Sequence, residues 1–425
     1  MSFINRKATQ LKPSATLKIN QKIIKLREEG RIIYHFGFGQ SPFPVPSPIV
    51  EELKNNAASN KYLPTAGLPQ LKNQIAKFLR KHQNIGATES SIFIGPGSKE
   101  LLYQTILLID GTYLIPKGSW VSYVPQITLN DKEFAVLDTY FEDCYKLRPD
   151  ILETYLKTST SETHVLILNS PNNPTGAVYT EAELEALARV CRSNNVLVLS
   201  DEIYSQLTFR SSAAPSISTH YPENTIVYGG LSKVFAAGGY RCGFMHVPPN
   251  LEALYEPFRS LFSETFSAVS APIQYASVTA FAYGDQVCIQ VEDSKKILET
   301  IGHFVEQSLV DAGLQCTHPE GGFYMLVDFE PFRKKLETLD LDDSVSLANY
   351  ILEDWNVALL PGTDFYFSSE AYIFRLAYVD FDGKKALMAY QKNEKMVLDI
   401  NFIKTFAPNV FMGVHKLKEF VNSLP

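Results

Sequence analysis

The stretch TIVYGGLSKVFAAGGYRCG, residues 225–243, decides how the rest of this sequence is interpreted. Residues 225–229 are mostly apolar or small and predict a buried β-strand. Lys233 follows this strand, and Arg241 comes eight residues after the lysine, among glycines. This arrangement suits a lysine that forms an imine beside a bound phosphate. A single lysine is more often a solvated surface charge, so the interpretation depends on the other polar motifs of the chain.

The overall composition is that of an ordinary globular protein. The chain has 425 residues, 45% hydrophobic and 20% charged, with a net charge of −7, which is long enough for two or three domains but offers no basic surface for nucleic acid or an anionic membrane. The sequence has no apolar run of about 18 residues that could span a membrane. No long apolar run occurs near the N-terminus, so we expect no secretory signal.

The cysteines and histidines point to neither disulfides nor a metal site. The five cysteines are scattered and lack the CxxC spacing, which predicts reduced thiols in the cytoplasm. The eight histidines show no HxxxH or HExxH spacing, so we expect no bound metal.

The N-terminal part predicts a helix, a strand and an extended segment. Residues 16–30 have the spacing of an amphipathic helix that ends at Gly30. Its apolar stripe consists of Ile19, Ile23, Ile24 and Leu26. Residues 32–36 predict a short strand. Prolines at alternate positions follow and predict an extended crossing segment, because proline disrupts helices and central strands. They are Pro42, Pro44, Pro46 and Pro48.

The middle of the chain alternates predicted strands and helices. Apolar runs predict strands at residues 92–95, 164–169, 196–200 and 225–229. Helices are expected at residues 98–110 and 181–194, the second with Thr180 as its N-cap and Glu183 completing a capping box. Apolar strands joined by helices predict a mainly parallel sheet covered on both faces.

After about residue 300 the pattern changes to that of a smaller α+β unit. Helices are expected at residues 295–312 and 345–355, and strands at residues 323–329 and 372–378.

Polar motifs follow four of the predicted strands, at the sheet edge where α/β proteins bind ligands. They are Gly97-Ser98-Lys99, Asn172-Asn173-Pro174-Thr175-Gly176, Asp201-Glu202-Ile203-Tyr204 and Lys233. Asp201 follows an apolar run, and a buried carboxylate is unfavourable unless it faces a cation, such as a protonated pyridine nitrogen, or caps the next helix. Gly97 and Ser98 open a helix, where free N–H groups attract an anion; the alternative is an ordinary N-cap.

These motifs together resemble the class I/II aminotransferase family of fold-type I pyridoxal-phosphate enzymes. The resemblance runs from about residue 30 to the end of the chain. It rests on residues 230–243, on Asn173-Pro174-Thr175-Gly176, on Ser200-Asp201-Glu202-Ile203-Tyr204, on Phe374-Arg375-Leu376 and on four further stretches at residues 62–67, 120–123, 319–324 and 360–363.

The resemblance implies an α/β architecture with two domains. Residues 51–300 would form a large domain that binds pyridoxal 5′-phosphate and contains a mainly parallel sheet of the seven-stranded type. Residues 1–50 and 301–425 would form a smaller α+β domain. The family also implies a cytoplasmic homodimer whose two active sites are shared between subunits.

The resemblance further implies a role for individual residues. Lys233 would bind the cofactor as an imine and carry the proton of the substrate, Asp201 would face the ring nitrogen, and Tyr204 would hydrogen-bond the ring oxygen. Other cofactor-binding residues would be Gly97, Ser98, Lys99, Trp120, Asn173, Ser232 and Arg241, with Tyr62 reaching the phosphate of the neighbouring subunit. Substrate would be bound by Gly39, Asn173 and Arg375.

Two positions depart from the family pattern. Gly230 stands where many aspartate aminotransferases have a serine, so Ser232 could supply that phosphate hydrogen bond. Cys242 replaces the usual aliphatic residue after the arginine.

The motifs fix the cofactor better than the reaction. They fit an aminotransferase that moves an amino group from an L-amino acid, with aspartate and aromatic amino acids as the candidates, to a 2-oxo acid such as 2-oxoglutarate. The alternatives are a carbon–sulfur β-lyase, an enzyme similar to aminocyclopropane carboxylate synthase, and a non-catalytic amino-acid sensor. A dicarboxylic substrate needs a second cation, for which Lys99 and Arg259 are the candidates.

Overall fold

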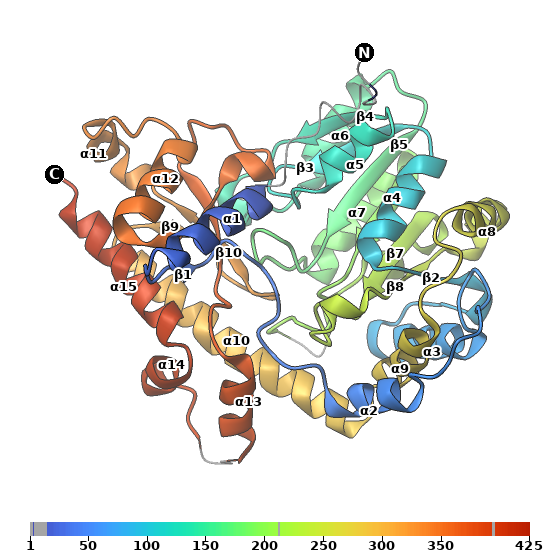
Figure 1. Cartoon of the computed structure of the whole chain (residues 1–425). Helices are drawn as coiled ribbons and strands as arrows, with labels where there is room; N and C mark the ends of the chain where they lie inside the picture. The colour runs from blue at the N-terminus through green and yellow to red at the C-terminus, as the bar shows by residue number, and fades with distance from the viewer. Residues whose placement is uncertain (1–2, 4–14, 211–212, 393–395) are drawn as a thin grey trace.

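The computed structural model describes residues 3, 15–210, 213–392 and 396–425, and these residues form three β-sheets surrounded by helices (Figure 1). The largest sheet has seven strands in the order β2-β8-β7-β6-β5-β3-β4. Their bounds are β2 Ile92–Gly95, β3 Thr112–Pro116, β4 Glu133–Leu137, β5 His164–Asn169, β6 Leu197–Asp201, β7 Thr225–Gly230 and β8 Gly243–His246. Six of the seven strands run in the same direction and β8 runs opposite to them, so the predicted mainly parallel sheet and the α/β fold class are confirmed.

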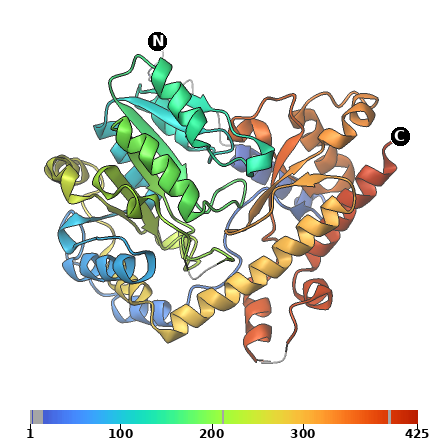
Figure 2. The same ribbon diagram turned by 180° about the vertical axis from the view of Figure 1, so that it is seen from behind.

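Helices cover both faces of this sheet, and β5 illustrates why. Its residues Val165 and Ile167 belong to one apolar cluster, whereas Leu166 and Leu168 belong to another. Successive side chains of a strand point to opposite faces, so a strand with apolar residues on both faces needs cover on both. The first cluster includes residues of α4 (Ser98–Leu108), α5 (Tyr123–Leu129) and α8 (Tyr255–Glu264), and the second includes residues of α6 (Pro149–Thr158) and α7 (Glu181–Ser193), which faces the viewer in Figure 2.

The capping box predicted for α7 is present. The Thr180 hydroxyl accepts a hydrogen bond from the backbone N–H of Glu183 at 3.3 Å, and the Glu183 carboxylate accepts one from the backbone N–H of Thr180 at 2.7 Å. The helix therefore begins where the sequence places it, directly after the polar loop that follows β5.

The C-terminal part of the chain forms a second, antiparallel sheet. Its order is β12-β13-β10-β9, and a short parallel pair, β1 with β11, lies apart from it. The strands are β9 Gln315–Cys316, β10 Tyr324–Asp328, β12 Leu360–Pro361, β13 Ile373–Ala377, β1 Tyr34–His35 and β11 Val357–Ala358. The helices of this part are α11 Arg333–Glu337, α12 Ser344–Trp355, α13 Gly383–Lys392, α14 Ile400–Phe406 and α15 Pro408–Ser423.

The long helix α10, Asp285–Val310, runs from one part of the molecule to the other (Figures 1 and 2). Its 26 residues correspond to a length of about 39 Å. It begins ten residues earlier than the predicted helix at 295–312. The remaining helices are α1 Ala15–Glu28, α2 Ser47–Asn55, α3 Pro69–Gln83 and α9 Ala271–Ala282. None of the described helices is long and apolar enough to cross a membrane.

Two details of the N-terminal prediction were wrong. Ile24 is 56% exposed, whereas Ile23 and Leu26 are buried, because Ile24 lies on a different side of α1 from its apolar stripe. Pro48 is not part of the extended segment: it occupies the first turn of α2, where a missing backbone N–H leaves no hydrogen bond unmade.

Candidate active site

A cavity of about 570 Å³ lies at the carboxyl ends of β5 and β6, below the segment at residues 38–40 and beside β10 and β13. This volume is suitable for a small-molecule ligand. The structure brings eleven of the predicted site residues to its wall: Gly39, Ser98, Lys99, Trp120, Asn173, Asp201, Tyr204, Ser232, Lys233, Arg241 and Arg375. Gly97 lies against Arg241, since a Cβ on this glycine would be 2.6 Å from Nη2 of the arginine. Tyr62 is 95% exposed and does not line the cavity of its own chain.

Asp201 is the last residue of β6 and presents a buried carboxylate to the cavity. Its Oδ2 accepts a hydrogen bond from the hydroxyl of Tyr123 at 2.8 Å. Burial raises the pKa of Asp201 to about 6, although the hydrogen bonds from Tyr123 and from the backbone of Ile203 and the charge of Lys233 lower it. A cation next to this carboxylate would stabilise its ionised form.

Lys233 enters the cavity from the loop that follows β7. Its Nζ donates a hydrogen bond to the carbonyl oxygen of Gly39 at 2.9 Å. The same ammonium lies 5.7 Å from the ring centre of Tyr204 and 5.5 Å from that of Phe323. The amine is therefore held by a neutral carbonyl and two aromatic rings.

Tyr204 lies opposite a second tyrosine, which the sequence analysis did not assign. The hydroxyl oxygens of Tyr204 and Tyr324 are 3.0 Å apart. The Tyr324 hydroxyl also donates to the carbonyl oxygen of Gly39 at 3.2 Å. Burial raises the pKa of Tyr204 well above its ordinary value, and the neighbouring Tyr324 raises it further, so Tyr204 keeps its proton.

Arg375 lies on β13 and is only 3% exposed. It donates to the side-chain oxygen of Asn173 at 3.2 Å and to the carbonyl oxygen of Gly37 at 2.6 Å, and its Nε has no hydrogen-bond partner among the described residues. The guanidinium stacks 4.9 Å from the ring centre of Tyr324. Burial lowers the pKa of Arg375, and a planar guanidinium with a free N–H is suited to a carboxylate.

The other end of the cavity has the features of an anion site. Gly97, with φ +97°, caps α4, and Ser98 is the first residue of that helix. Arg241 donates to the carbonyl oxygens of Gly238 at 2.9 Å and Pro96 at 3.3 Å, which holds its guanidinium next to this helix start. Backbone N–H groups at a helix N-terminus and an adjacent arginine are typical of a phosphate site.

Lys99 extends from the first turn of α4 across Trp120, with its Nζ 4.8 Å from the ring centre. Partial burial lowers the pKa of Lys99, and the positive charges of Arg241 and Lys233 lower it further. The indole of Trp120 meets the ring of Tyr123 edge-on at 5.4 Å, so the ring that Lys99 covers is fixed in place.

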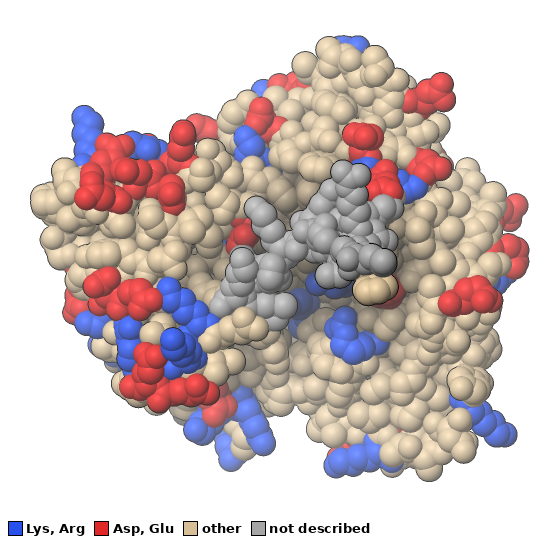
Figure 3. All heavy atoms as spheres, turned by 45° about the horizontal axis from the view of Figure 1, so that its top comes forward, with Lys and Arg blue, Asp and Glu red and all other residues tan. Residues whose placement is uncertain are grey.

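The cavity contains more positive than negative charge. Four cations line it, namely Lys99, Lys233, Arg241 and Arg375, against the single carboxylate of Asp201 among the described lining residues. No ion pair between described residues includes any of these four. In Figure 3, Lys and Arg atoms lie near the centre of the face turned forward. The arrangement therefore calls for anionic ligands.

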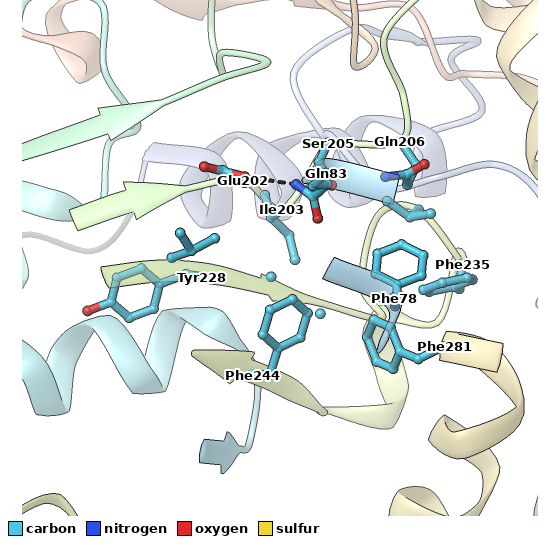
Figure 4. A pocket seen from close by; sticks show the side chains of 14 residues that line it. Phe78, Gln83, Glu202, Ile203, Ser205, Gln206, Tyr228, Phe235, Phe244 and Phe281 are labelled. Carbon is cyan, nitrogen blue, oxygen red and sulfur yellow. Dashed lines mark hydrogen bonds between the residues drawn. The ribbon is translucent and has the colours of Figure 1, made fainter. Parts of the chain in front are cut away.

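A second cavity, of only about 10 Å³, lies beside the next residue of the same motif, Glu202 (Figure 4). The buried Glu202 carboxylate accepts hydrogen bonds from Ser200 at 2.8 Å, Ser216 at 2.5 Å and Gln83 at 2.8 Å. Burial raises its pKa to about 7, despite these hydrogen bonds. This space is about large enough for one water molecule, so the large cavity is the candidate active site.

Tyr123 and Tyr324 were the functional candidates missed from the sequence. Both belong to stretches that carry the family resemblance. However, no residue near either tyrosine in the sequence indicates that Tyr123 contacts Asp201 or that Tyr324 contacts Tyr204. Tyr123 lies 78 residues before Asp201, and Tyr324 lies 120 residues after Tyr204.

Comparisons with known proteins agree on one family. Residues 31–382 match the family model for aminotransferases of class I and II. The aspartate aminotransferase of Bacillus subtilis (strain 168) is 31% identical over 369 residues, which cover 85% of this chain and 91% of that protein. An asparagine–oxo-acid transaminase of Streptococcus mutans is 29% identical over 376 residues, covering 86% and 92%. The structure of the Thermus thermophilus aspartate aminotransferase with maleate has a TM-score of 0.83 at 26% identity, covering 99% of this chain and 100% of that one.

Proposed function

This chain belongs to the class I and II aminotransferase family, and we propose that it moves the amino group of an L-amino acid to a 2-oxo acid with pyridoxal 5′-phosphate as its cofactor. The observation that carries the proposal is the charge arrangement of the large cavity. A buried carboxylate, Asp201, faces a space whose other charged lining residues, among those described, are cations, and one of these is Lys233 in the loop after β7. A phosphate, a ring that can be protonated and a carboxylate substrate together match these charges.

The residues of the cavity fit this cofactor. We propose that Asp201 faces the ring nitrogen, that Tyr204 and Asn173 hydrogen-bond the ring oxygen, and that Trp120 packs against the ring. Arg241, Ser232, Ser98 and the N–H groups next to Gly97 would bind the phosphate. When bound, the cofactor supplies an electron sink for the electrons left behind when the substrate Cα–H bond breaks.

Lys233 and Arg375 would act on the substrate itself. Lys233 Nζ is proposed to anchor the cofactor and then, as a free amine, to take the proton from the substrate Cα and deliver it again during the transfer. Arg375 would bind the α-carboxylate through its Nε and one terminal nitrogen, giving up the hydrogen bond to Gly37. The backbone N–H of Gly39 would add a further donor to that carboxylate.

We propose that the preferred substrates are dicarboxylic, aspartate and 2-oxoglutarate, with Lys99 binding the second carboxylate. Two observations support Lys99 over Arg259. Lys99 lines the cavity, whereas Arg259 lies on α8, where its guanidinium forms an ion pair with Glu256 and stacks on Phe93. The relatives named as aspartate aminotransferases are consistent with this choice. An aromatic donor would leave the ammonium of Lys99 without an anionic partner.

The alternative enzymes of this fold would use the same lysine, aspartate and arginines. The relatives compared above are named as aminotransferases, which favours amino transfer. A non-catalytic sensor is disfavoured because the candidate catalytic side chains converge in one cavity.

We further propose a cytoplasmic homodimer in which Tyr62, exposed on its own chain, reaches the phosphate of the neighbouring subunit. All five cysteines are free thiols, which supports a reducing compartment. Residues 51–300 are proposed to form the cofactor-binding domain, and residues 1–50 with 301–425 the smaller one; residues 1, 2 and 4–14 lie outside the described residues.

A spectroscopic experiment tests this function. The cofactor-saturated protein is mixed with single amino acids, without an acceptor, and its visible absorbance is followed. Aspartate should change the absorbance stoichiometrically, and 2-oxoglutarate should restore it, with glutamate as product. The Lys233→Ala variant, which keeps the other cations, should show no turnover. Release of pyruvate and ammonia would instead indicate a lyase, and binding without product would indicate a sensor.

A further inference from the structure

Tyr324 occupies a junction between the residues proposed to bind the substrate and those proposed to bind the cofactor. In the antiparallel pair of β10 and β13, Leu326 lies opposite Arg375. Tyr324 is two residues before Leu326, so its side chain is on the same face as Arg375 and diagonal to it. This register explains why the Arg375 guanidinium lies 4.9 Å from the centre of the Tyr324 ring.

The hydroxyl of Tyr324 has two acceptors within reach and one proton to give. Tyr204 lies at 3.0 Å and the carbonyl oxygen of Gly39 at 3.2 Å. The same carbonyl already accepts a hydrogen bond from Lys233 at 2.9 Å. A hydroxyl has one donor and two acceptor positions, so Tyr324 can donate to Gly39 or to Tyr204, but not fully to both.

The approach of Gly39 to this hydroxyl is close. A Cβ on Gly39 would lie 2.0 Å from the Tyr324 oxygen, which no side chain could occupy without displacing it. Tyr324 itself is 1% exposed and its ring is packed edge-on against that of Tyr204, at 5.9 Å. The position of the hydroxyl is therefore fixed, and the choice of acceptor is a rotation of its O–H bond alone.

We propose that Tyr324 is a positioning residue that strengthens the hydrogen bond donated by Tyr204 to the cofactor. This inference rests on the function proposed above. When the Tyr204 hydroxyl donates its hydrogen bond to the cofactor, it no longer donates one to Tyr324. The Tyr324 O–H bond can then rotate from the Gly39 carbonyl and donate a hydrogen bond to the Tyr204 oxygen. Consecutive hydrogen bonds polarise one another, so Tyr204 then donates more strongly. Tyr324 thereby links the substrate-facing segment at Gly39 to the electronic state of the cofactor.

The test compares the pH titration of the visible absorbance of cofactor-saturated wild-type protein and Tyr324→Phe. The substitution removes only the hydroxyl and keeps the ring beneath Arg375. In the wild type, a stronger hydrogen bond to the ring oxygen of the cofactor stabilises the anionic form of that oxygen and lowers the midpoint pH of the absorbance titration. Tyr324→Phe weakens this hydrogen bond, so its midpoint pH should be higher by about 0.5 unit. The dissociation constant of maleate, a dicarboxylate that does not react, should change by less than about threefold, because the contact between Arg375 and the ring remains.

Tyr378→Phe is the matched control. Tyr378 is fully buried, and its hydroxyl has no hydrogen-bond partner among the described residues, so this variant loses the same atom outside the cavity. An unchanged or lowered midpoint in Tyr324→Phe, an equal rise in Tyr378→Phe, or a larger loss of maleate affinity would overturn the proposal. A wild-type protein without any visible absorbance that depends on pH would instead refute the proposed cofactor, so the two failures are distinguishable.

Discussion

Replacing Glu202 with glutamine removes an ionisable group from the polar cluster beside Asp201 while keeping the shape of the side chain. In the folded protein the pKa of Glu202 is raised from 4.5 to about 7, chiefly by burial. Each pKa unit corresponds to about 1.4 kcal/mol, so keeping this carboxylate ionised in the folded state destabilises the protein by about 3 kcal/mol. The amide of glutamine has no such penalty.

The sign of the pH dependence follows from the raised pKa. Below pH 4.5 Glu202 is protonated in both the folded and the unfolded chain, and its ionisation costs the folded state nothing. As the pH rises toward 7, the unfolded chain ionises first, and the wild type loses stability relative to Glu202→Gln. Above about pH 7 the folded carboxylate ionises as well, and the difference stays constant.

Differential scanning calorimetry of both proteins between pH 4.5 and 8 measures this difference. With an unfolding entropy of about 2.1 cal/mol/K per residue, 1 kcal/mol corresponds to about 1 °C in Tm for a chain of 425 residues. As the pH rises from 4.5 to 8, the Tm of Glu202→Gln should therefore increase by about 3 °C relative to that of the wild type. Glu162→Gln, at an exposed position, is the control. A Tm difference that is independent of pH, or that shrinks as the pH rises, would refute the reasoning.

Three further predictions concern the large cavity. Lys99→Met should raise KM for aspartate and 2-oxoglutarate about 10- to 100-fold, as expected for loss of a hydrogen bond to a charged group, and should leave KM for alanine nearly unchanged; an equal effect on both donors would contradict the role of Lys99. Tyr123→Phe removes a hydrogen bond that lowers the pKa of Asp201, so Asp201 should become protonated at a higher pH than in wild type. As the pH is lowered, the variant should therefore lose cofactor affinity, measured by fluorescence titration, at a higher pH than the wild type does. Gly39→Ala should weaken maleate binding, because its Cβ meets the Tyr324 hydroxyl; unchanged calorimetric affinity would argue against the close contact.

The predicted parts of the fold are those that a local pattern determines. Residues 165–168 lie in a strand that is buried on both faces, and such strands are recognisable because their central residues form a continuous apolar run. The antiparallel direction of β8 was not predicted, since strand direction depends on the connection to β7 rather than on composition. The helix at Asp285–Val310 was predicted too short because residues 285–294 are rich in polar side chains and carry a weaker apolar stripe.

The candidate site divides in the same way. Lys233 and Asp201 stand in short motifs at strand ends, so the sequence indicates both their chemistry and their common location. Arg375 lies in the middle of β13 and was assigned from the family motif that contains it. The contacts of Tyr123 and Tyr324 join distant segments and depend on how two sheets and a helix pack, which no local pattern contains. The choice between Lys99 and Arg259 likewise needed the structure, because the direction of each side chain decides it.

The segment at residues 37–39 has a consequence for how ligands enter. The carbonyl oxygens of Gly37 and Gly39 accept hydrogen bonds from Arg375 and Lys233, respectively, in place of water or carboxylates. An arriving anion therefore exchanges places with a neutral dipole and breaks no ion pair. Both carbonyl groups belong to one short stretch of main chain. Displacing one of them from its cation should therefore weaken the hydrogen bond of the other, so that Arg375 and Lys233 become available to their ligands together.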